Sequence, residues 1–264
     1  MWLVSWNVNS IRRRLDLVER FVQEEQPEVL ALQETRCSDA QFPHSTFAHL
    51  GYESVHLGSG GHGGVAMLSN IGLNRVTYGF SGDHGPPFDE PRLISADVDG
   101  QRIATIYAPN GRRVRTSAWQ FKLAWFELLR TELTLELDET DELLVMGDFN
   151  VCPTDADLYN PAKKRDRNLV SVPERAALQR ILDLGLTDVG ELHHAPDERF
   201  TWFSHAEGQF ESNLGYRLDL VLATSAVSDR ILQCRPLREW RVPELGPSDH
   251  VPVATEIANR INRS

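Results

Sequence analysis

Cysteine is scarce in this sequence, which contains three cysteines among 264 residues. Cys37, Cys152 and Cys234 are odd in number and far apart, and no Cys-X-X-Cys pair occurs. Such a set provides neither a disulfide framework nor the ligand spacing of a zinc site. We therefore expect structural or incidental thiols in a protein of a reducing compartment.

Long apolar runs are lacking as well. No stretch approaches the roughly 18 residues of a membrane-spanning helix, so we expect no association with a membrane. The first residues, from Met1 to Trp6, turn polar too soon for a secretory signal peptide. The sequence therefore predicts a cytoplasmic location.

Positive charge is in deficit. Lys and Arg number 27 against 38 Asp and Glu, which gives a formal net charge of −11. This charge argues against a non-specific DNA coat protein or a membrane-surface protein, because their partners would repel it. It is compatible with an enzyme that acts on DNA, which needs only an acidic metal site and a local group of basic residues. The simplest interpretation of the total charge is solubility.

The order of the apolar segments indicates an α/β fold. Length alone suits one large domain or two small ones, and the sequence has no low-complexity linker and no repeat. Helices are expected after Ser10 as N-cap, over residues 117–137, and over residues 173–182. Many strands and few helices suggest stacked sheets with helices outside. Strands are expected over residues 2–6, 29–33, 64–68, 93–98, 102–107, 143–147, 218–222 and 251–257.

Polar residues stand at or beside the ends of five of these strands. A single acid at a strand end usually caps a turn, but an acid inside an apolar run, such as Asp219, needs a partner when it is buried. If the five strand ends converge, they form one cluster of carboxylates, amides and an imidazole. The residues concerned are Asn7, Asn9, Glu34, Asp148, Asn150, Asp219 and the tripeptide Ser248-Asp249-His250.

The composition of this cluster suggests a metal and a substrate. Oxygen ligands with little sulfur or histidine favour Mg²⁺ or Mn²⁺ over zinc. Mg²⁺ usually takes one or two carboxylates and completes its shell with water and substrate phosphate. Hydrolysis of a phosphodiester needs a polarised phosphoryl group, an oriented water and a stabilised leaving oxygen. Because one acid–base residue supplies only about 10²–10⁴-fold, the metal and hydrogen-bond donors must supply much of the remaining acceleration.

Seven short motifs are spread over nearly the whole chain. They are Trp6-Asn7-Val8-Asn9, Leu32-Gln33-Glu34-Thr35, Tyr107-Ala108-Pro109-Asn110-Gly111, Gly147-Asp148-Phe149-Asn150, Thr201-Trp202, Arg217-Leu218-Asp219 and Pro247-Ser248-Asp249-His250. In their order and spacing they resemble the exonuclease III family of AP endonucleases, within the endonuclease/exonuclease/phosphatase superfamily. The resemblance implies one catalytic domain over residues 1–264, folded as a four-layer α/β sandwich in which two mainly antiparallel sheets pack face to face between helices.

The resemblance also implies roles for the metal-binding and water-binding residues. Glu34, supported by Asn7, is expected to be the main metal ligand, and Asp249 to contact the metal or its water. Asp148 and Asn150 are expected to activate and orient the attacking water. Whether one or two metal ions act is left open by the sequence.

Three further residues are expected around the scissile phosphate. His250 would contact the phosphate, with Asp219 bonded to its other ring nitrogen, which fixes the tautomer and raises the pKa of the imidazole. Tyr107 would place its hydroxyl on the phosphate or the leaving group. Two alternatives remain for the general base, Asp148 and His250.

The same resemblance implies a surface that contacts DNA. Asn110, Gly111 and Arg112 belong to a loop that enters the DNA minor groove in the family, and Arg113 and Arg115 follow in the same loop. The functional interpretation of this basic group is phosphate contact. For a second basic group, solvated charge is an equally good interpretation; its members are Lys163, Lys164, Arg165 and Arg167.

Four more positions are assigned to the DNA side by the resemblance. Lys122 matches a family lysine near the active site, and a solvated helix lysine is the alternative. Trp202, Tyr216 and Leu218 match residues that line a pocket for a flipped, baseless sugar, which should be small and apolar so that an intact nucleotide is excluded.

We therefore predict a monomeric DNA-repair hydrolase that depends on Mg²⁺, with Mn²⁺ as a substitute. It would cut double-stranded DNA 5′ to abasic sites and process blocked 3′ ends through a 3′–5′ exonuclease activity. One alternative is a relative that acts on RNA, a nucleotide or a lipid headgroup, and Trp202 and Asn110-Gly111 argue against it. The other is a DNA-binding protein without catalysis, which would have no need for the complete polar cluster.

Overall fold

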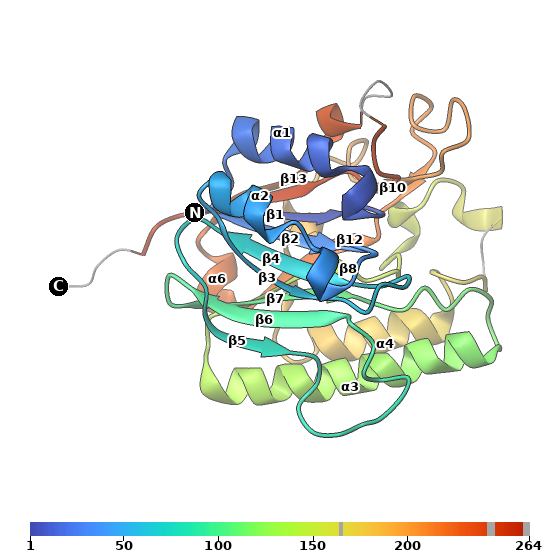
Figure 1. Ribbon diagram of the computed structural model, residues 1–264. Coiled ribbons are helices and arrows are strands. Elements are labelled where there is room, and N and C mark those ends of the chain that lie inside the picture. Colours follow the sequence, from blue (N-terminus) through green and yellow to red (C-terminus); the bar gives the residue numbers. More distant parts are fainter. Residues whose placement is uncertain (164–165, 242–245, 261–264) are drawn as a thin grey trace.

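The computed structural model describes residues 1–163, 166–241 and 246–260. Two six-stranded sheets pack against each other, and helices cover their outer faces (Figure 1). Helices α1 (Leu15–Glu25) and α2 (His44–His49) lie on one sheet, and α3 (Ser117–Glu139) and α4 (Val172–Leu182) lie on the other. The predicted four-layer α/β sandwich is confirmed.

The first sheet contains one parallel strand pair among antiparallel ones. Strands β1 (Trp2–Asn7) and β2 (Val29–Gln33) are parallel, with Trp6 beside Leu32, and the chain between them forms α1. All other pairs in this sheet are antiparallel. The strand order is β13 (Ile231–Pro236), β14 (Val253–Ile257), β1 (Trp2–Asn7), β2 (Val29–Gln33), β4 (Val65–Ser69) and β3 (Glu53–Leu57).

The second sheet repeats this arrangement. Strands β7 (Gln101–Tyr107) and β8 (Leu143–Asp148) are parallel, with Tyr107 beside Asp148, and α3 forms the crossover between them. The remaining pairs are antiparallel, so the prediction of mainly antiparallel sheets holds for both sheets. The strand order is β5 (Asn74–Tyr78), β6 (Leu93–Val98), β7 (Gln101–Tyr107), β8 (Leu143–Asp148), β12 (Asp219–Ala223) and β9 (Thr187–Asp188).

Alternation along the strands explains the layering. In β1, Leu3 packs between the sheets with Met146 of β8, whereas Val4 and Trp6 pack against Phe21 of α1. Successive side chains of a strand point to opposite faces, so a strand that is apolar at every position is buried on both. Strands β2 and β4 are buried throughout, which is why the sequence shows them as nearly continuous apolar runs. Strand β7 is equally buried although it carries Gln101, Arg102 and Thr105.

The eight expected strands are all present, and their observed bounds lie within two residues of those predicted. The sequence did not reveal β3, β5, β9 and β13, which are the four edge strands of the two sheets. An edge strand is half exposed and carries polar residues, so it gives a weak apolar signal. Two short strands, β10 (Trp202–Phe203) and β11 (Gly215–Tyr216), were also missed, as were the short helices α5 (Val189–His193) and α6 (Ser225–Ser228).

The helix starts required one correction. Ser10 is not an N-cap: it has a φ of 92° and its side chain makes no capping bond. Residues Ile11–Arg13 form a 3-10 turn, and α1 starts after Arg14. By contrast, α4 begins one residue before the predicted Pro173, with a capping box between Ser171 and Glu174.

The inner face of α3 packs on the second sheet. Phe126, Leu129 and Leu133 are buried there, whereas Trp119 near the start of the helix is only partly buried. Among the residues that the structure describes, no helix has the length and apolar character to cross a membrane.

Gly147 has no room for a side chain. Its φ is +147°, and a Cβ atom would lie 2.0 Å from the carbonyl oxygen of Ile106 in the neighbouring strand β7. Gly72 also has a positive φ, +96°, but nothing lies within 4 Å of its Cβ position. We expect Gly147→Ala to reduce the free energy of unfolding by about 1–3 kcal/mol more than Gly72→Ala does, because it adds overpacking to backbone strain. Chemical denaturation of both variants would measure this, and equal losses would contradict it.

Candidate active site

The parallel strand pairs bring four polar residues to one edge of the two sheets. Asn7 ends β1 and Glu34 follows β2, while Tyr107 ends β7 and Asp148 ends β8. Strands β1 and β2 pack on β7 and β8 across the interface between the sheets. The carboxyl ends of both parallel pairs therefore meet, although these residues lie far apart in the sequence.

Asn7 joins the two sheets at this edge. Its Nδ2 donates to Glu34 Oε1 at 3.2 Å and to Asp148 Oδ2 at 3.0 Å. The Tyr107 hydroxyl donates to the same Glu34 oxygen at 2.8 Å. Burial, followed by the charges of Glu34 and Asp148, raises the pKa of Tyr107 well above its usual value, so the hydroxyl keeps its proton.

The second oxygen of Glu34 faces an arginine. Arg36 Nε donates to Glu34 Oε2 at 2.9 Å, and the Glu34 side chain is 13% exposed. Glu34 is therefore a partly accessible carboxylate at the mouth of the cluster. It is the one carboxylate of the cluster that is paired with an arginine, among the residues described.

Asp148 and Asn150 form a rigid pair. The Asn150 backbone N–H donates to Asp148 Oδ1 at 2.9 Å, and its Nδ2 donates to Asp148 Oδ2 at 3.2 Å and to the Ala108 carbonyl at 3.0 Å. Asn110 Nδ2 donates to Asn150 Oδ1 at 3.0 Å. Burial raises the pKa of Asp148, and the nearby charges of Asp219 and Glu34 add to this effect.

His250 lies between two carboxylates. Its Nδ1 is 2.7 Å from Asp219 Oδ2, and its Nε2 is 3.7 Å from Asp148 Oδ2. Burial alone would lower the pKa of His250, but the charges of Asp219 and Asp148 outweigh it and raise the pKa to about 10. The other Asp219 oxygen, Oδ1, is buried and has no hydrogen-bond partner among the described residues.

Asp249 faces away from this group. Asn9 Nδ2 donates to its Oδ1 at 2.8 Å, and the Trp202 indole N–H donates to its Oδ2 at 3.0 Å. Burial would raise the pKa of Asp249, but His250 and these two hydrogen bonds lower it. The predicted metal-binding residue thus links the cluster to Trp202.

Two buried arginines hold the loop that carries Asp249 and His250, and no sequence pattern pointed to either of them. Arg14 Nη2 donates to the Pro247 carbonyl at 3.1 Å, and Arg241 Nη1 donates to the Ser248 carbonyl at 2.6 Å. Ser248 Oγ in turn donates to the Asn7 carbonyl at 2.7 Å. Arg14 lies in a helical pattern and Arg241 in an irregular segment, so neither stands out as part of a site.

An apolar patch adjoins the cluster. The rings of Trp202 and Tyr216 lie 5.2 Å apart between centroids, and Leu218 belongs to the same apolar cluster. Trp202 is partly exposed, whereas Tyr216 and Leu218 are nearly buried. The three residues predicted to line a pocket are therefore brought together, with Trp202 as the accessible member.

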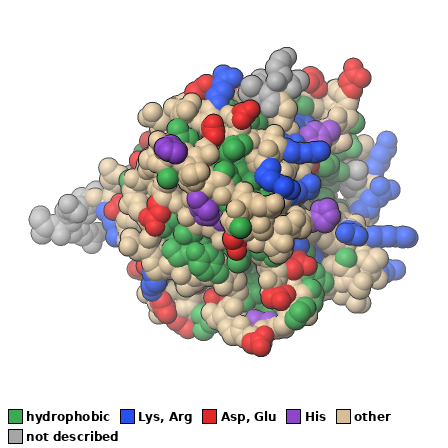
Figure 2. Space-filling model, in the orientation of Figure 1, with side chains coloured by type: hydrophobic (Ala, Val, Ile, Leu, Met, Phe, Trp, Pro, Cys, Tyr) green, Lys and Arg blue, Asp and Glu red, His purple; other side chains and the backbone are tan. Residues whose placement is uncertain are grey.

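Basic side chains gather at the same end of the molecule. Arg112, Arg113, Arg115, Lys163 and Arg167 are all exposed. Figure 2 shows Lys and Arg side chains collected at the right, where the loops that follow β7 and β8 lie in Figure 1. Lys164 and Arg165 of the second predicted basic group lie outside the described residues. The acidic total charge thus coexists with a locally basic face.

Lys122 is not part of that face, which corrects its assignment to a DNA contact. Its side chain is fully buried and paired with Glu174, which is equally buried. Asn110 and Arg112 are exposed, but Gly111 between them is buried. Lys122 therefore lies beneath the loop of residues 110–112, and not on the DNA-contacting surface to which it was assigned.

The donor set fits a hard divalent cation. Asp148, Asp219 and Glu34 place excess negative charge in a largely buried cluster, and Asp219 keeps one oxygen without a partner among the described residues. Within that same part of the chain, no group of three or more His, Cys, Asp and Glu side chains is arranged to hold a metal. A magnesium site built from one or two carboxylates, water and substrate phosphate needs no such group.

Comparison with known proteins gives the family. The profile of the Endonuclease/Exonuclease/phosphatase family matches residues 4–250. The chain belongs to this family. It is 31% identical to exodeoxyribonuclease III of Haemophilus influenzae, over 97% of this chain and 99% of that protein.

Two solved structures of the endonuclease/exonuclease/phosphatase family are similar in fold and sequence. The 3′ phosphatase NExo from Neisseria, bound to a product DNA hairpin, has a TM-score of 0.92 and 32% identity, covering 98% of this chain and 99% of that one. An AP endonuclease from Archaeoglobus fulgidus has a TM-score of 0.89 and 33% identity, covering 97% and 99%. Within its family, the chain is a hydrolytic nuclease of the exonuclease III type.

The charge on His250 can be tested directly. We expect Asp219→Asn to lower the pKa of His250 from about 10, because the substitution removes the carboxylate that faces Nδ1. Nuclear magnetic resonance of the imidazole nitrogens in the metal-free protein would follow this titration.

His194 provides the internal control. Burial, with help from the Arg217 charge, lowers its pKa to about 3, so its ring should stay neutral near pH 7 in both proteins. An unchanged His250 titration in Asp219→Asn would contradict the pairing.

Proposed function

We propose that this nuclease is a DNA-repair phosphodiesterase that depends on Mg²⁺ and cuts double-stranded DNA 5′ to abasic sites. The observation that carries the proposal is the continuous set of contacts from Glu34 through Asn7 to Asp148 and His250. It joins an oxygen-rich cation site, a water-orienting pair and a charged imidazole at one edge of the sheets.

Asp148 and Asn150 orient the attacking water, and Asp148 takes its proton. Both Asp148 oxygens are held by hydrogen bonds from Asn150, so the carboxylate has little freedom to turn. We assign the general base to Asp148 and not to His250. The imidazole has Nδ1 on Asp219, and that carboxylate favours the protonated ring.

His250 then serves as a donor. Its Nε2 faces Asp148 across 3.7 Å, where a non-bridging phosphate oxygen and the water would both be within reach. Tyr107 keeps its proton and lies on the opposite sheet, where its hydroxyl donates to Glu34 Oε1 at 2.8 Å; with substrate bound it would turn this donor to a phosphate oxygen. Preorganised donors of this kind stabilise the charge that develops on a phosphate oxygen.

Glu34 would hold the cation, with Asn7 fixing the carboxylate in place. The cation, when bound, supplies positive charge for the phosphate oxygens and the leaving oxygen. Asp249, bonded to Asn9 and Trp202, would contribute through a water molecule. Mn²⁺ offers the same preference for oxygen ligands and would substitute.

The DNA-contacting face consists of the exposed arginines after Gly111 and the apolar patch around Trp202. The arginines suit phosphate contact, and the patch suits a deoxyribose without a base. Asn110 and Gly111 form the loop between them, where they would flank the lesion. The protein acts as a monomer, and its three buried, free thiols suit the reducing cytoplasm.

Processing of blocked 3′ ends is the second activity we propose. The 3′ phosphatase and the AP endonuclease resemble this chain about equally, at 32% and 33% identity. At a 3′-phosphate, no nucleotide follows the phosphate, and at an abasic site, a sugar without a base follows it. One site can therefore accept both phosphates. Rates on a 3′-phosphate duplex and an abasic duplex, measured side by side, give the balance.

Cleavage should depend on the metal and on Asp148. A duplex with one abasic analogue should be cut in Mg²⁺ and not in EDTA. Asp148→Asn should reduce the rate by at least about 10²–10⁴-fold, because it removes the proton acceptor, while binding of the duplex persists. Cleavage in EDTA would overturn the metal dependence, and joint loss of binding and cleavage in a folded variant would make Asp148 a binding residue.

Trp202 should be needed for the abasic substrate. Trp202→Ala removes a large apolar surface from the sugar and should lower kcat/KM by roughly 10–100-fold. Trp202→Phe is the matched control, because it keeps an aromatic ring and loses only the indole N–H to Asp249. We expect Trp202→Phe to retain most of the activity, and equal loss in both variants would assign the effect to the hydrogen bond.

A further inference from the structure

The buried ammonium of Lys122 contacts both loops that form the active site. Its side chain and that of Glu174 are each 0% exposed. Besides Glu174 Oε1, Lys122 Nζ bonds to the carbonyl oxygen of Asn150 at 2.6 Å and to that of Asn110 at 3.4 Å. Its three N–H groups thus meet three acceptors from three separate segments.

The two carbonyls belong to residues with different tasks. Asn150 follows β8 and orients the Asp148 carboxylate, and its backbone has a φ of +51°. Asn110 follows β7 and begins the exposed loop that carries Arg112. The direct hydrogen bond between their side chains, at 3.0 Å, ties the two loops at the surface, and Lys122 ties them from beneath.

Glu174 connects this ammonium to the long segment before α4. Its Oε1 also accepts from the Leu169 N–H at 3.1 Å, and its Oε2 accepts from the Ser171 N–H and hydroxyl at 3.2 and 2.5 Å. Asn168 Nδ2 donates to the Asn110 carbonyl at 2.7 Å. The end of the segment over residues 153–171 is therefore anchored to the same loop.

The fit around Gly111 shows how tightly the loop lies on this support. Gly111 has a φ of +78°, and a Cβ atom would lie 2.9 Å from Lys122 Cδ and 2.9 Å from Asn168 Oδ1. The loop therefore rests on the Lys122 stem, which fixes its height above α3.

We propose that the Lys122–Glu174 ion pair is a positioning element that sets the water-orienting Asn150 and the DNA-contacting loop at Asn110-Gly111 in one fixed relation. This inference rests on the function proposed above. Lys122 and Glu174 touch neither substrate nor cation and act through Asn150 and Asn110. A displacement of about 1 Å in such groups can cost 10²-fold in rate.

If the ion pair only stabilised the fold, replacing both partners together would leave the rate of cleavage unchanged. Replacing a buried ion pair by uncharged residues of similar size is often neutral for stability, whereas removing one partner is strongly destabilising. The informative variant is therefore the paired change Lys122→Met/Glu174→Gln. Glutamine keeps the capping interaction with Ser171, and methionine keeps most of the lysine stem under Gly111.

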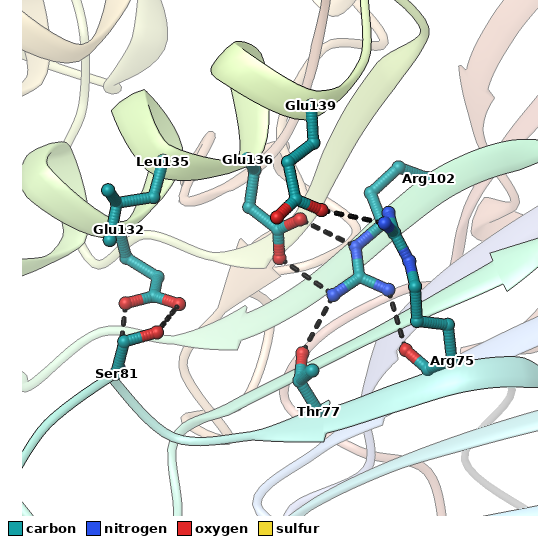
Figure 3. A pocket seen from close by; sticks show the side chains of 8 residues that line it. All are labelled: Arg75, Thr77, Ser81, Arg102, Glu132, Leu135, Glu136 and Glu139. Atoms are coloured by element: carbon teal, nitrogen blue, oxygen red, sulfur yellow. Dashed lines mark hydrogen bonds and ion pairs between the residues drawn. The ribbon is translucent and has the colours of Figure 1, made fainter.

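A matched control is available on the same helix. Arg102 and Glu136 form a second buried ion pair, with Arg102 Nε 2.7 Å from Glu136 Oε2, at the start of β7 and the end of α3 (Figure 3). Figure 3 shows this pair with Thr77 and Arg75, and Arg102 lies at the start of β7, whereas Tyr107 ends that strand. Arg102→Met/Glu136→Gln removes a buried ion pair of the same type and should leave turnover unchanged.

The first measurement is hydrogen–deuterium exchange on the free proteins. In Lys122→Met/Glu174→Gln, the segments over residues 108–112 and 149–152 should both exchange faster than in wild type, with the sheets unchanged. In the Arg102→Met/Glu136→Gln control, these two segments should keep their wild-type exchange. Unchanged exchange of both segments in the first variant would overturn the proposal. Hydrogen–deuterium exchange does not depend on activity, so it tests the positioning claim even if the wild-type protein fails to cut an abasic duplex. Such a failure would contradict only the proposed function.

The second measurement is the steady-state rate of cleavage of the abasic duplex in Mg²⁺ over a range of duplex concentrations, which gives kcat and KM. The Lys122→Met/Glu174→Gln variant should lose about 10–100-fold in kcat with little change in KM, because the DNA-contacting groups remain present but the catalytic group is displaced. In an Asn150→Ala background the same change should have little further effect, since the ion pair acts through Asn150. The proposal would be overturned if the fold-losses in kcat caused by the ion-pair change and by Asn150→Ala simply multiplied in the combined variant. An equal loss of kcat in the Arg102→Met/Glu136→Gln control would also overturn it.

Discussion

The architecture depends on one constraint, which is that each sheet contains a single parallel strand pair at its centre. Two parallel strands must end at the same edge, and a helix must return the chain between them. When the sheets stack with these pairs facing, four strand ends meet, and Asn7, Glu34, Tyr107 and Asp148 come together. The antiparallel neighbours β12 and β14 then supply Asp219 and His250 from their starting ends.

The site brings several carboxylates together in a largely buried region, and the fold stabilises each of them separately. Three carboxylates lie close together, and each has its own compensation: Arg36 for Glu34, the Asn150 donors for Asp148, and the imidazole for Asp219. Asp249 is compensated by neutral donors, Asn9 and Trp202. Because Trp202 belongs to the apolar patch, its indole N–H is the point at which this patch and the polar cluster share a hydrogen bond.

Much of this could be predicted from the sequence. The buried central strands are mostly apolar, so the polar residues at their ends stand out in the sequence. The members of the cluster could therefore be named as candidates. The edge strands could not be found, since β5 is mostly exposed and its residues resemble a loop. The roles of the individual site residues are still predictions, because geometry shows their proximity and not their chemistry.

Lys122 illustrates the limit of pattern reading. A lysine near the start of a helix looks the same in sequence whether it faces solvent or the core. Its burial depends on Glu174, which lies 52 residues further along the chain on another helix and provides the opposite charge. The same holds for Arg14 and Arg241, which hold the loop of Asp249 and His250 through backbone carbonyls that no motif marks.

The position of β14 within the first sheet has a consequence for synthesis in the cell. It lies between β13 and β1, and the loop just before it carries His250, whose carbonyl accepts a hydrogen bond from Trp6. A nascent chain that has reached Asp148, or even Asp219, holds most of the charged groups but still lacks the imidazole and the strand that seats it. The order of residues along the polypeptide thus leaves the site incomplete until nearly all of the domain has been made.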